Sequence, residues 1–145
     1  MDIKKLYNDK LEQYGSQDFR SLYWGDANGT SAKRRYAQMA EHIDFSNSSV
    51  LEIGCGFGSF FKLGFNCKHY VGFDVNENFI KIAKQTYNTF RWHTSMPDPK
   101  EMFDVCICSG VAGNRGGPAW NPVLLQNFLS DTYSRCTQKV LINFP

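Results

Sequence analysis

The chain has 145 residues, of which 42% are hydrophobic, and its formal net charge is +2. This length is typical of one domain with a single core. The balanced charge argues against a polyanionic partner, and no apolar run reaches the ~18 residues that a membrane span needs. The first residues lack the apolar stretch of a secretory signal. We therefore expect one cytoplasmic domain over residues 1–145, with no membrane partner and with nucleic acid disfavoured as a partner.

The five cysteines lie at positions 55, 67, 106, 108 and 136, and no pair has the C-x-x-C spacing. Such cysteines are typical of small buried apolar residues in a reducing compartment. The histidines at positions 42, 69 and 93 share no spacing that is typical of metal ligands. We expect reduced thiols, no disulfide framework and no metal site.

In chain order, apolar residues at helical spacing predict a first helix over residues 2–14. Residues 15–30 are rich in turn-forming residues but also carry aromatic side chains, which predicts a loop that packs on the rest of the chain. A second helix is expected over residues 30–43, with Thr30 or Ser31 as its N-cap. Residues 1–47 therefore form a helical leader in this interpretation, and we expect it to act as a lid.

Strands and helices alternate through the rest of the chain. The expected strands are residues 50–54, 69–75, 90–93, 103–108 and 139–144, and the expected helices are residues 59–63, 76–87 and 123–136. This alternation is typical of a parallel sheet with right-handed crossovers. The predicted fold class is α/β, a Rossmann-like three-layer sandwich with a mainly parallel sheet and the N-terminal helices packed on it.

The first predicted strand runs into a loop with glycine at every second position: Gly54, Gly56 and Gly58. Glycine adopts backbone angles that other residues resist, and it has no Cβ to obstruct a close neighbour. The dinucleotide fingerprint G-x-G-x-x-G would place its third glycine at Ser59, so the spacing here differs from that fingerprint. We expect the loop to leave room for a ligand, and a tight turn without a ligand is the alternative.

Several polar residues follow the carboxyl ends of the other predicted strands, where open parallel sheets bind ligands. Asp74 ends the second strand about 20 residues beyond the glycines, as a ribose-binding carboxylate does, although it could instead cap the next helix. Val75 is expected to lie against an adenine ring. Ser95 and Met96 end the third strand and are predicted on the adenine side, with core packing as the alternative for Met96.

The glycine loop with Glu52 two residues before it resembles motif I of the class I S-adenosylmethionine (SAM)-dependent methyltransferases. The resemblance extends to a leader with Tyr14-Gly15 and Trp24-Gly25, and to a Ser-Gly pair after the fourth strand. The leader resembles that of a bacterial group of small methyltransferases, and the resemblance covers essentially the whole chain.

This resemblance implies strand order 3-2-1-4-5 and binding of SAM, with S-adenosylhomocysteine as the product. Glu52 would lie near the methionine amino group, and Tyr14 and Trp24 would fold over the site. Packing of the N-terminal helices is the alternative for these two aromatic residues. The implied cofactor-binding residues are Tyr14, Trp24, Glu52, Gly54, Cys55, Gly56, Gly58, Asp74, Val75, Ser95, Met96, Ser109 and Gly110.

No catalytic residue can be assigned from these motifs, because the cofactor carries the reactive group. His93 and the loop 112–121 are candidates for a base by position only. Residues 114–117 with Trp120 could bind an anionic or aromatic acceptor, and a connecting loop is the alternative. The signature of amino-methyltransferases that act on nucleic-acid bases is absent after the fourth strand. A small-molecule acceptor is therefore expected.

Class I methyltransferases normally add a reversed hairpin after the fifth strand, and this chain has too few residues for it. Residues 48–145 are therefore expected to form a truncated core whose fifth strand has an open edge, which homo-oligomer formation could cover. Three functions remain open: a SAM-dependent methyltransferase, a SAM-binding protein or relic without transferase activity, and an NAD- or nucleotide-binding Rossmann module. The positions of Gly58 and Ser59 disfavour the third.

Overall fold

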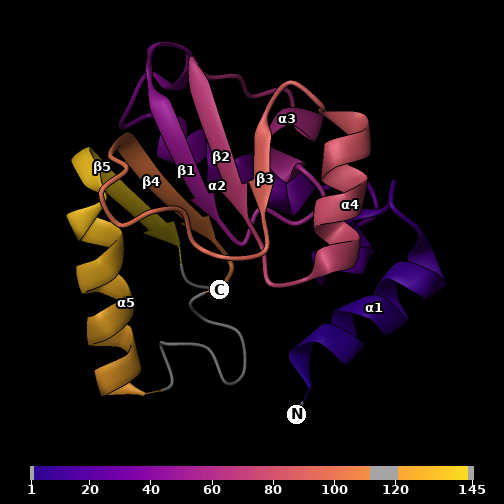
Figure 1. Ribbon diagram of the computed structural model, residues 1–145. Helices are drawn as coiled ribbons and strands as arrows, with labels where there is room; N and C mark the ends of the chain where they lie inside the picture. Colours follow the sequence, from indigo (N-terminus) through magenta and orange to yellow (C-terminus); the bar gives the residue numbers. More distant parts are fainter. Residues whose placement is uncertain (1, 112–120, 144–145) are drawn as a thin grey trace.

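The computed structural model describes residues 2–111 and 121–143. Its strands are β1 (Ser49–Ile53), β2 (His69–Phe73), β3 (Arg91–His93), β4 (Phe103–Ser109) and β5 (Cys136–Asn143). They form one five-stranded sheet in the order β3-β2-β1-β4-β5 (Figure 1), and every neighbouring pair is parallel. The predicted α/β fold class and strand order are confirmed.

The helices are α1 (Ile3–Tyr14), α2 (Thr30–Ala40), α3 (Ser59–Lys62), α4 (Glu77–Thr86) and α5 (Pro122–Ser134), with short 3₁₀ helices η1 (Phe19–Leu22) and η2 (Phe45–Asn47). Among the described residues, no helix is both long enough and apolar enough to cross a membrane. The first 3₁₀ helix, η1, lies in the segment that the sequence predicted as a loop, and η2 lies between the second predicted helix and the first predicted strand. Short 3₁₀ turns lack a strong periodic pattern and are difficult to predict from the sequence alone.

The two faces of the sheet bury different side chains because residues alternate along each strand. Val50 of β1 belongs to a core cluster that also contains residues of α2, α3 and α4, including Tyr36 and Phe60. Leu51 and Ile53 belong to a second cluster on the opposite face, against which Phe128 of α5 packs. Helices therefore cover both faces, as a three-layer arrangement requires.

The N-terminus of α2 differs from the prediction. Gly29 is the N-cap, with a φ of 72°, and neither Thr30 nor Ser31 caps the helix. The Asp26 carboxylate accepts hydrogen bonds from the backbone N–H groups of Thr30 and Ser31 at 2.7 and 3.1 Å. A Cβ at Gly29 would lie 2.7 Å from the ring of Phe19. The left-handed turn and this close contact require glycine at the N-cap. Because glycine has no side chain that could accept from the first helix N–H groups, the Asp26 carboxylate accepts from them instead.

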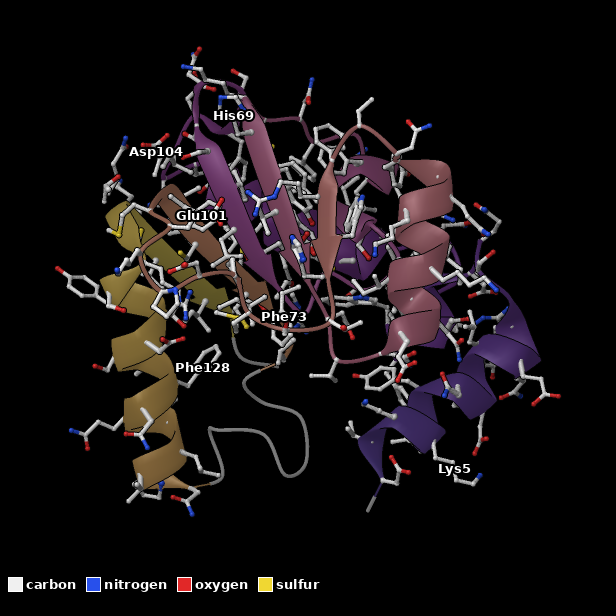
Figure 2. The ribbon with its side chains drawn as sticks, viewed as in Figure 1. Lys5, His69, Phe73, Glu101, Asp104 and Phe128 are labelled. Carbon is white, nitrogen blue, oxygen red and sulfur yellow. The ribbon has the colours of Figure 1, made fainter. Side chains whose placement is uncertain are left out.

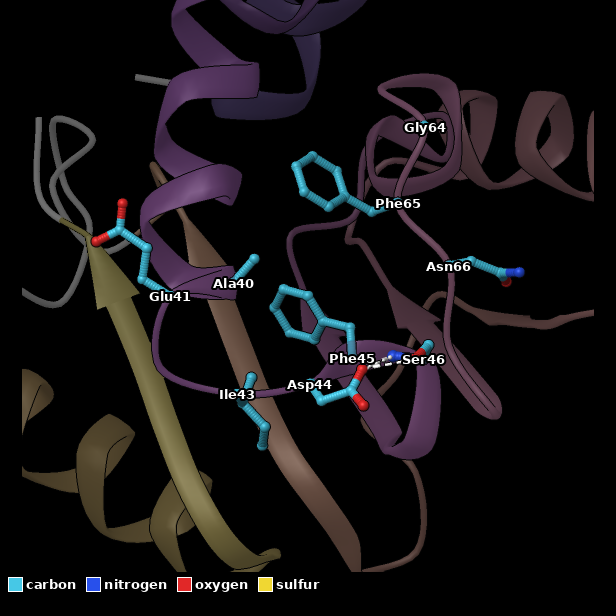
Figure 3. A pocket seen from close by; sticks show the side chains of 9 residues that line it. All are labelled: Ala40, Glu41, Ile43, Asp44, Phe45, Ser46, Gly64, Phe65 and Asn66. Carbon is cyan, nitrogen blue, oxygen red and sulfur yellow. Dashed lines mark hydrogen bonds between the residues drawn. The ribbon is translucent and has the colours of Figure 1, made fainter.

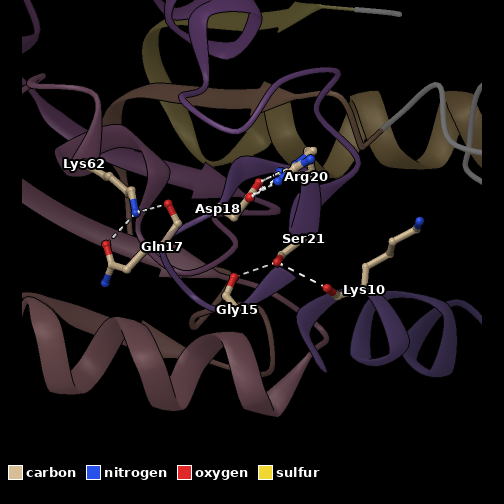
Figure 4. Close-up of polar contacts among 7 residues, drawn as sticks. All are labelled: Lys10, Gly15, Gln17, Asp18, Arg20, Ser21 and Lys62. Atoms are coloured by element: carbon tan, nitrogen blue, oxygen red, sulfur yellow. Dashed lines mark hydrogen bonds and ion pairs between the residues drawn. The ribbon is translucent and has the colours of Figure 1, made fainter. Parts of the chain in front are cut away.

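The segment between α1 and α2 is bonded to its neighbours, as Figure 4 shows. The Ser21 hydroxyl, which is fully buried, donates to the Gly15 carbonyl at 2.7 Å. The Lys62 ammonium on α3 donates to the Gln17 carbonyl oxygen and to its side-chain oxygen, both at 2.7 Å. Residues 15–22 are therefore held against α3, which follows the glycine loop.

Some boundaries also differ from the predictions. The second helix ends at Ala40, and Ile43 packs against the core from the following turn. Strand β5 begins at Cys136 instead of residue 139, because Cys136 already pairs with Phe103 of β4. The predicted burial of cysteines is confirmed for four of the five, and Cys136 is half-buried.

Candidate functional site

The candidate site lies at the end of the sheet where the parallel strands terminate. Figure 2 shows His69 and Asp104 at the start of β2 and β4, and Phe73 at the opposite end of β2. Strand order reverses between β1 and β4, whose neighbours β2 and β5 lie on opposite sides. Open α/β sheets bind ligands in the crevice at such a reversal.

Asp104, near the start of β4, has a structural role. Its carboxylate accepts from the backbone N–H of Ser49 at 2.8 Å and from the Ser49 hydroxyl at 3.0 Å. These donors lower the pKa of Asp104 below its ordinary value. Asp104 therefore ties β4 to β1 at the amino end of the sheet, away from the candidate site.

The glycine loop is held against the end of β2. The backbone N–H groups of Gly54 and Cys55 donate to the Phe73 carbonyl at 2.7 and 3.0 Å. Gly54, Gly56 and Gly58 have φ values of 78°, 56° and 93°. All three lie in the left-handed region that favours glycine, so this sequence pattern produces the sharp turn from β1 into α3.

Side chains of the protein itself occupy the space beside all three of these glycines, and a Cβ at Gly58 would lie 2.7 Å from the ring of Tyr87. A Cβ at Gly54 would lie 1.9 Å from Cγ2 of Val111, and a Cβ at Gly56 would lie 2.9 Å from the methyl carbons of Leu22. The sequence led us to expect a ligand in this space. In the structure, Leu22 from η1 and Val111 after β4 approach the loop instead. A ligand that contacts the loop on this side requires these two side chains to move.

Asp74 follows β2 and points toward the glycine loop. Its Oδ2 accepts from the Gly56 N–H at 3.0 Å, and its Oδ1 accepts from the Asn76 N–H at 2.8 Å. Burial raises the pKa of Asp74, while these two donors oppose the shift. The cap of α4 is Asn76, whose side chain accepts from the Asn78 N–H at 3.0 Å. A carboxylate has about four acceptor positions, so Asp74 retains capacity for further donors.

The residues predicted on the adenine side are exposed to different degrees. Val75 is 46% exposed although it is apolar, and Ser95 is exposed after β3. Met96 is half-buried and packs against the core cluster on the α5 face. The structure therefore leaves Val75 and Ser95 exposed, and Met96 makes the core contacts that we gave as its alternative. A contact of any of these three residues with an adenine ring stays a prediction.

Glu52 is fully enclosed one residue before the end of β1. Its two carboxylate oxygens accept hydrogen bonds from the hydroxyls of Tyr36 on α2 and Tyr70 on β2. Burial raises the pKa of Glu52 to about 7, although the two tyrosine donors oppose the shift. The carboxylate thus joins the leader helix α2 to the sheet. A contact between Glu52 and a methionine amino group stays a prediction.

The end of β4 is fixed by a residue that the sequence analysis did not single out. The side chain of Asn143, at the end of β5, donates to the Ser109 hydroxyl oxygen at 3.3 Å and accepts from the Gly110 N–H at 3.0 Å. Ser109 is buried, and Gly110 has a φ of 82°. Asn143 lies 33 residues from Gly110, and no local motif connects the two positions.

The two leader aromatics lie in different surroundings. The Trp24 ring would be 3.8 Å from a Cβ on Gly110, which places Trp24 at the carboxyl end of β4. The guanidinium of Arg35 on α2 lies over the Trp24 ring, 4.9 Å from its centroid. The Tyr14 ring instead faces Lys10 and Arg20 of the leader, at 5.1 and 4.5 Å. The structure therefore brings Trp24, but not Tyr14, against the end of β4.

Helix α1 lies beside the Asp74 loop. The Asn8 side-chain oxygen accepts from the side-chain amides of Asn76 and Asn78 at 2.9 and 3.1 Å. The Tyr7 ring meets the rings of Tyr23 and Phe79 edge-on, at 5.2 and 5.8 Å between centroids. The leader therefore contacts the site through α1 as well as through Trp24.

Two candidates for the acceptor side were named from the sequence, and the structure describes only the first, His93. The Nε2 atom of His93 is buried and has no hydrogen-bond partner among the described residues, and the His93 carbonyl accepts from the Asp74 N–H at 3.1 Å. His93 is therefore next to Asp74 in the sheet. The candidate acceptor segment 114–117 and Trp120 lie outside the described residues. Asn121, the last residue of that loop, caps α5.

A surface groove lies elsewhere on the molecule (Figure 3). It is lined by residues from the end of α2, the turn around η2 and the segment after α3, including Glu41, Phe45 and Phe65. Because η2 directly precedes β1, this groove is at the amino end of that strand. None of the predicted site residues lines it.

Comparisons with known proteins agree with this geometry. A family model described as a methyltransferase domain matches residues 51–115, which include the glycine loop and Asp74. A sequence search of curated proteins returns no match.

Similar solved structures include phosphoethanolamine N-methyltransferase 1 from Haemonchus contortus, with a TM-score of 0.68 and 15% identity over 95% of this chain and 31% of that chain. The N-methyltransferase NodS from Bradyrhizobium japonicum WM9, in complex with S-adenosylhomocysteine, has a TM-score of 0.66 and 19% identity over 90% of this chain and 67% of that chain. A SAM-dependent methyltransferase from Clostridium acetobutylicum has a TM-score of 0.62 and 13% identity over 91% of this chain and 54% of that chain.

The protein therefore has the fold of the class I SAM-dependent methyltransferases. The chain spans about a third to two thirds of the length of these similar structures.

Proposed function

We propose that this protein binds SAM at the carboxyl ends of β1 and β2 and transfers its methyl group to a small-molecule acceptor. The observation that carries the proposal is the Asp74 carboxylate, which directly follows β2 and accepts a hydrogen bond from the Gly56 N–H at 3.0 Å. A carboxylate in this place can accept hydrogen bonds from the hydroxyls of a ribose.

The residues around Asp74 fit a nucleoside. Val75 is apolar and 46% exposed, and it adjoins Asp74 in the sequence, so it offers apolar surface for an adenine ring. Residues 54–58 form the turn that brings the backbone close to this position, and Ser95 lies exposed after the neighbouring strand. When bound, SAM supplies the activated methyl group. The protein's task is then to bind, to align the acceptor and to exclude water.

We propose that the leader, residues 1–47, is a lid over the core at 48–145. Its contacts support this role, since Leu22 approaches Gly56, Trp24 approaches Gly110, and Asn8 bonds to Asn76. Cofactor binding would shift Leu22 and Val111 away from the glycine loop. Trp24 would remain as a cover at the end of β4.

The proposal is tested by calorimetric titration of the protein with SAM, S-adenosylhomocysteine and NAD. Binding of either SAM compound, without binding of NAD, supports it. Binding of NAD alone contradicts it and favours a dinucleotide module. If SAM binds but no methyl group is transferred across a broad panel of small acceptors, the alternative of a SAM-binding protein without transferase activity is favoured.

The SAM affinities of two variants test whether the cofactor binds beside Asp74. Asp74→Ala is expected to weaken SAM binding by ~1–3 kcal/mol, the usual effect of losing a charge-assisted hydrogen-bond partner. Asp104→Ala is the matched control, because Asp104 also accepts from a backbone N–H but at the opposite end of the sheet. Equal affinities for SAM in both variants would remove Asp74 from the site.

A further inference from the structure

Lys62, the last residue of α3, ties the leader to the glycine loop. Its ammonium donates to the main-chain and side-chain oxygens of Gln17, both at 2.7 Å (Figure 4). The same ammonium lies over the rings of Phe19 on η1 and Phe57 in the glycine loop, 5.5 and 5.4 Å from their centroids. Burial lowers the pKa of Lys62. A half-buried ammonium is thus held by neutral oxygens and by the faces of two rings.

The contacts of Lys62 determine where Leu22 lies. Phe19 and Leu22 are the first and last residues of η1, and side chains three residues apart lie on the same side of a 3₁₀ helix. Phe19 is 1% exposed and meets the Phe57 ring edge-on, at 5.8 Å between centroids. Leu22 lies 2.9 Å from the position that a Cβ on Gly56 would have. The bonds that hold Phe19 on the glycine loop therefore hold Leu22 there too.

The backbone directly after η1 is strained. Among the non-glycine residues that the structure describes, Tyr23 alone has a positive φ, of 60°. A residue with a Cβ disfavours this left-handed conformation, which persists only where surrounding contacts impose it. Tyr23 lies between Leu22, which approaches Gly56, and Trp24, which approaches the end of β4. A rotation at Tyr23 would therefore relieve the strain and move Leu22 while Trp24 stays in place.

We propose that Lys62 is a positioning residue that holds η1 on the glycine loop and so restricts access of SAM to Gly56. This inference rests on the proposed function, in which Leu22 moves away from the loop when the cofactor binds. The bonds from Lys62 to Gln17 are broken in that state, so their free energy opposes binding. Relief of the left-handed turn at Tyr23 offsets part of this cost. A purely structural Lys62 would keep its contacts in the complex and would not alter the affinity.

The affinity for S-adenosylhomocysteine, measured by calorimetry, tests the inference. Lys62→Met keeps an unbranched apolar stem on the two rings but cannot donate to Gln17, so it should raise the affinity by about fivefold or more. Lys62→Arg retains a cation with N–H donors, and its affinity should return toward that of the wild type. Lys68→Met is the matched control, because Lys68 is exposed and directly precedes β2 at the amino end of the sheet.

Surface plasmon resonance separates the rates. Lys62→Met should raise the association rate constant and leave the dissociation rate constant unchanged, because the tie is absent from the complex. Gln17→Ala removes one of the two acceptors at an exposed position, so it should act in the same direction, more weakly, even if Lys62→Met fails to fold. Affinities of both variants equal to or below that of Lys68→Met overturn the inference. Failure of the wild type and of both variants to bind would instead reject the proposed function.

Discussion

The core on the face of the sheet that α2, α3 and α4 cover is rich in buried aromatic rings, whereas the core on the α5 face consists mainly of aliphatic side chains and cysteines, with Phe103 as its one buried aromatic residue among the described residues. On the first face, α2 and α4 each contribute three buried residues. On the second, Thr132 is the one fully buried residue of α5, while four of its large apolar residues are exposed: Val123, Leu124, Leu129 and Tyr133.

Because of this difference in buried side chains, the two faces have different roles in holding the leader and in stabilising the fold. The aromatic face fixes the leader, since Tyr36 of α2 bonds to the enclosed Glu52 and packs edge-on against Phe60. The contacts that bring Trp24 and Arg35 to the end of β4 belong to the same face. The α5 face contributes less buried apolar area, so we expect it to contribute less to the free energy of unfolding.

The largest effect is expected from Phe60→Ala. Phe60 is fully buried, and its ring contacts those of Tyr36, Phe45 and Tyr70. Removing this ring should lower the free energy of unfolding by roughly 3–5 kcal/mol, measured by urea denaturation. Leu129→Ala on α5 is the comparison, and its effect should be below about 1 kcal/mol because Leu129 is 39% exposed. Equal losses would remove the distinction between the faces.

The pH dependence of stability tests the enclosed carboxylate. The pKa of Glu52 is about 7 in the folded protein, above its ordinary value of 4.5, so the folded state holds this proton more tightly. The stabilisation is complete below pH 4.5 and is lost as the pH rises through 7. Relative to Glu52→Gln, which does not titrate, the wild type should lose about 3 kcal/mol between pH 4 and pH 8.

Chemical denaturation at several pH values measures this difference directly. Asp104→Asn gives a control of opposite sign, because hydrogen bonds lower the pKa of Asp104. A pH-independent difference between the wild type and Glu52→Gln would contradict a raised pKa at Glu52.

An intermediate effect is expected at Gly29. Its φ of 72° and the Phe19 ring beside it both disfavour a side chain. Gly29→Ala should therefore lower the free energy of unfolding by about 1–2 kcal/mol. Gly25→Ala is the control in the same loop, because a Cβ there has no neighbour within 4 Å. A neutral result at Gly29 would show that the leader tolerates a different turn before α2.

The smallest effect on stability is expected from the exposed side of α5. Tyr133 is 74% exposed and Leu124 is 51% exposed, so replacing both with serine should change the free energy of unfolding by less than about 1 kcal/mol. The same change should reduce self-association, measured by light scattering, if a second copy covers the open edge of β5 as the sequence led us to expect. If the wild type self-associates and the double variant has the same oligomeric state, the interface lies elsewhere on the molecule.

Much of the fold was predictable because its signals are local. The alternation of apolar segments with helical periodicity is visible within short windows, and it predicted all five strands. The glycine spacing predicted a sharp turn after β1, and three positive φ values confirm it. The site was less predictable. The local pattern did not show that Leu22 and Val111 approach the glycines, or that two tyrosines enclose Glu52.

The sequence by itself determined which segments form strands and helices, and it placed the glycine loop and Asp74 at the ends of neighbouring strands. These features depend on backbone preferences and on periodicity among nearby residues. Only the tertiary structure decided that Asn143 holds Gly110, that Asn8 holds Asn76, and that Trp24 supports Arg35 at the end of β4. The first two contacts join residues 33 and 68 positions apart, and their formation depends on how the strands pair and how the leader packs.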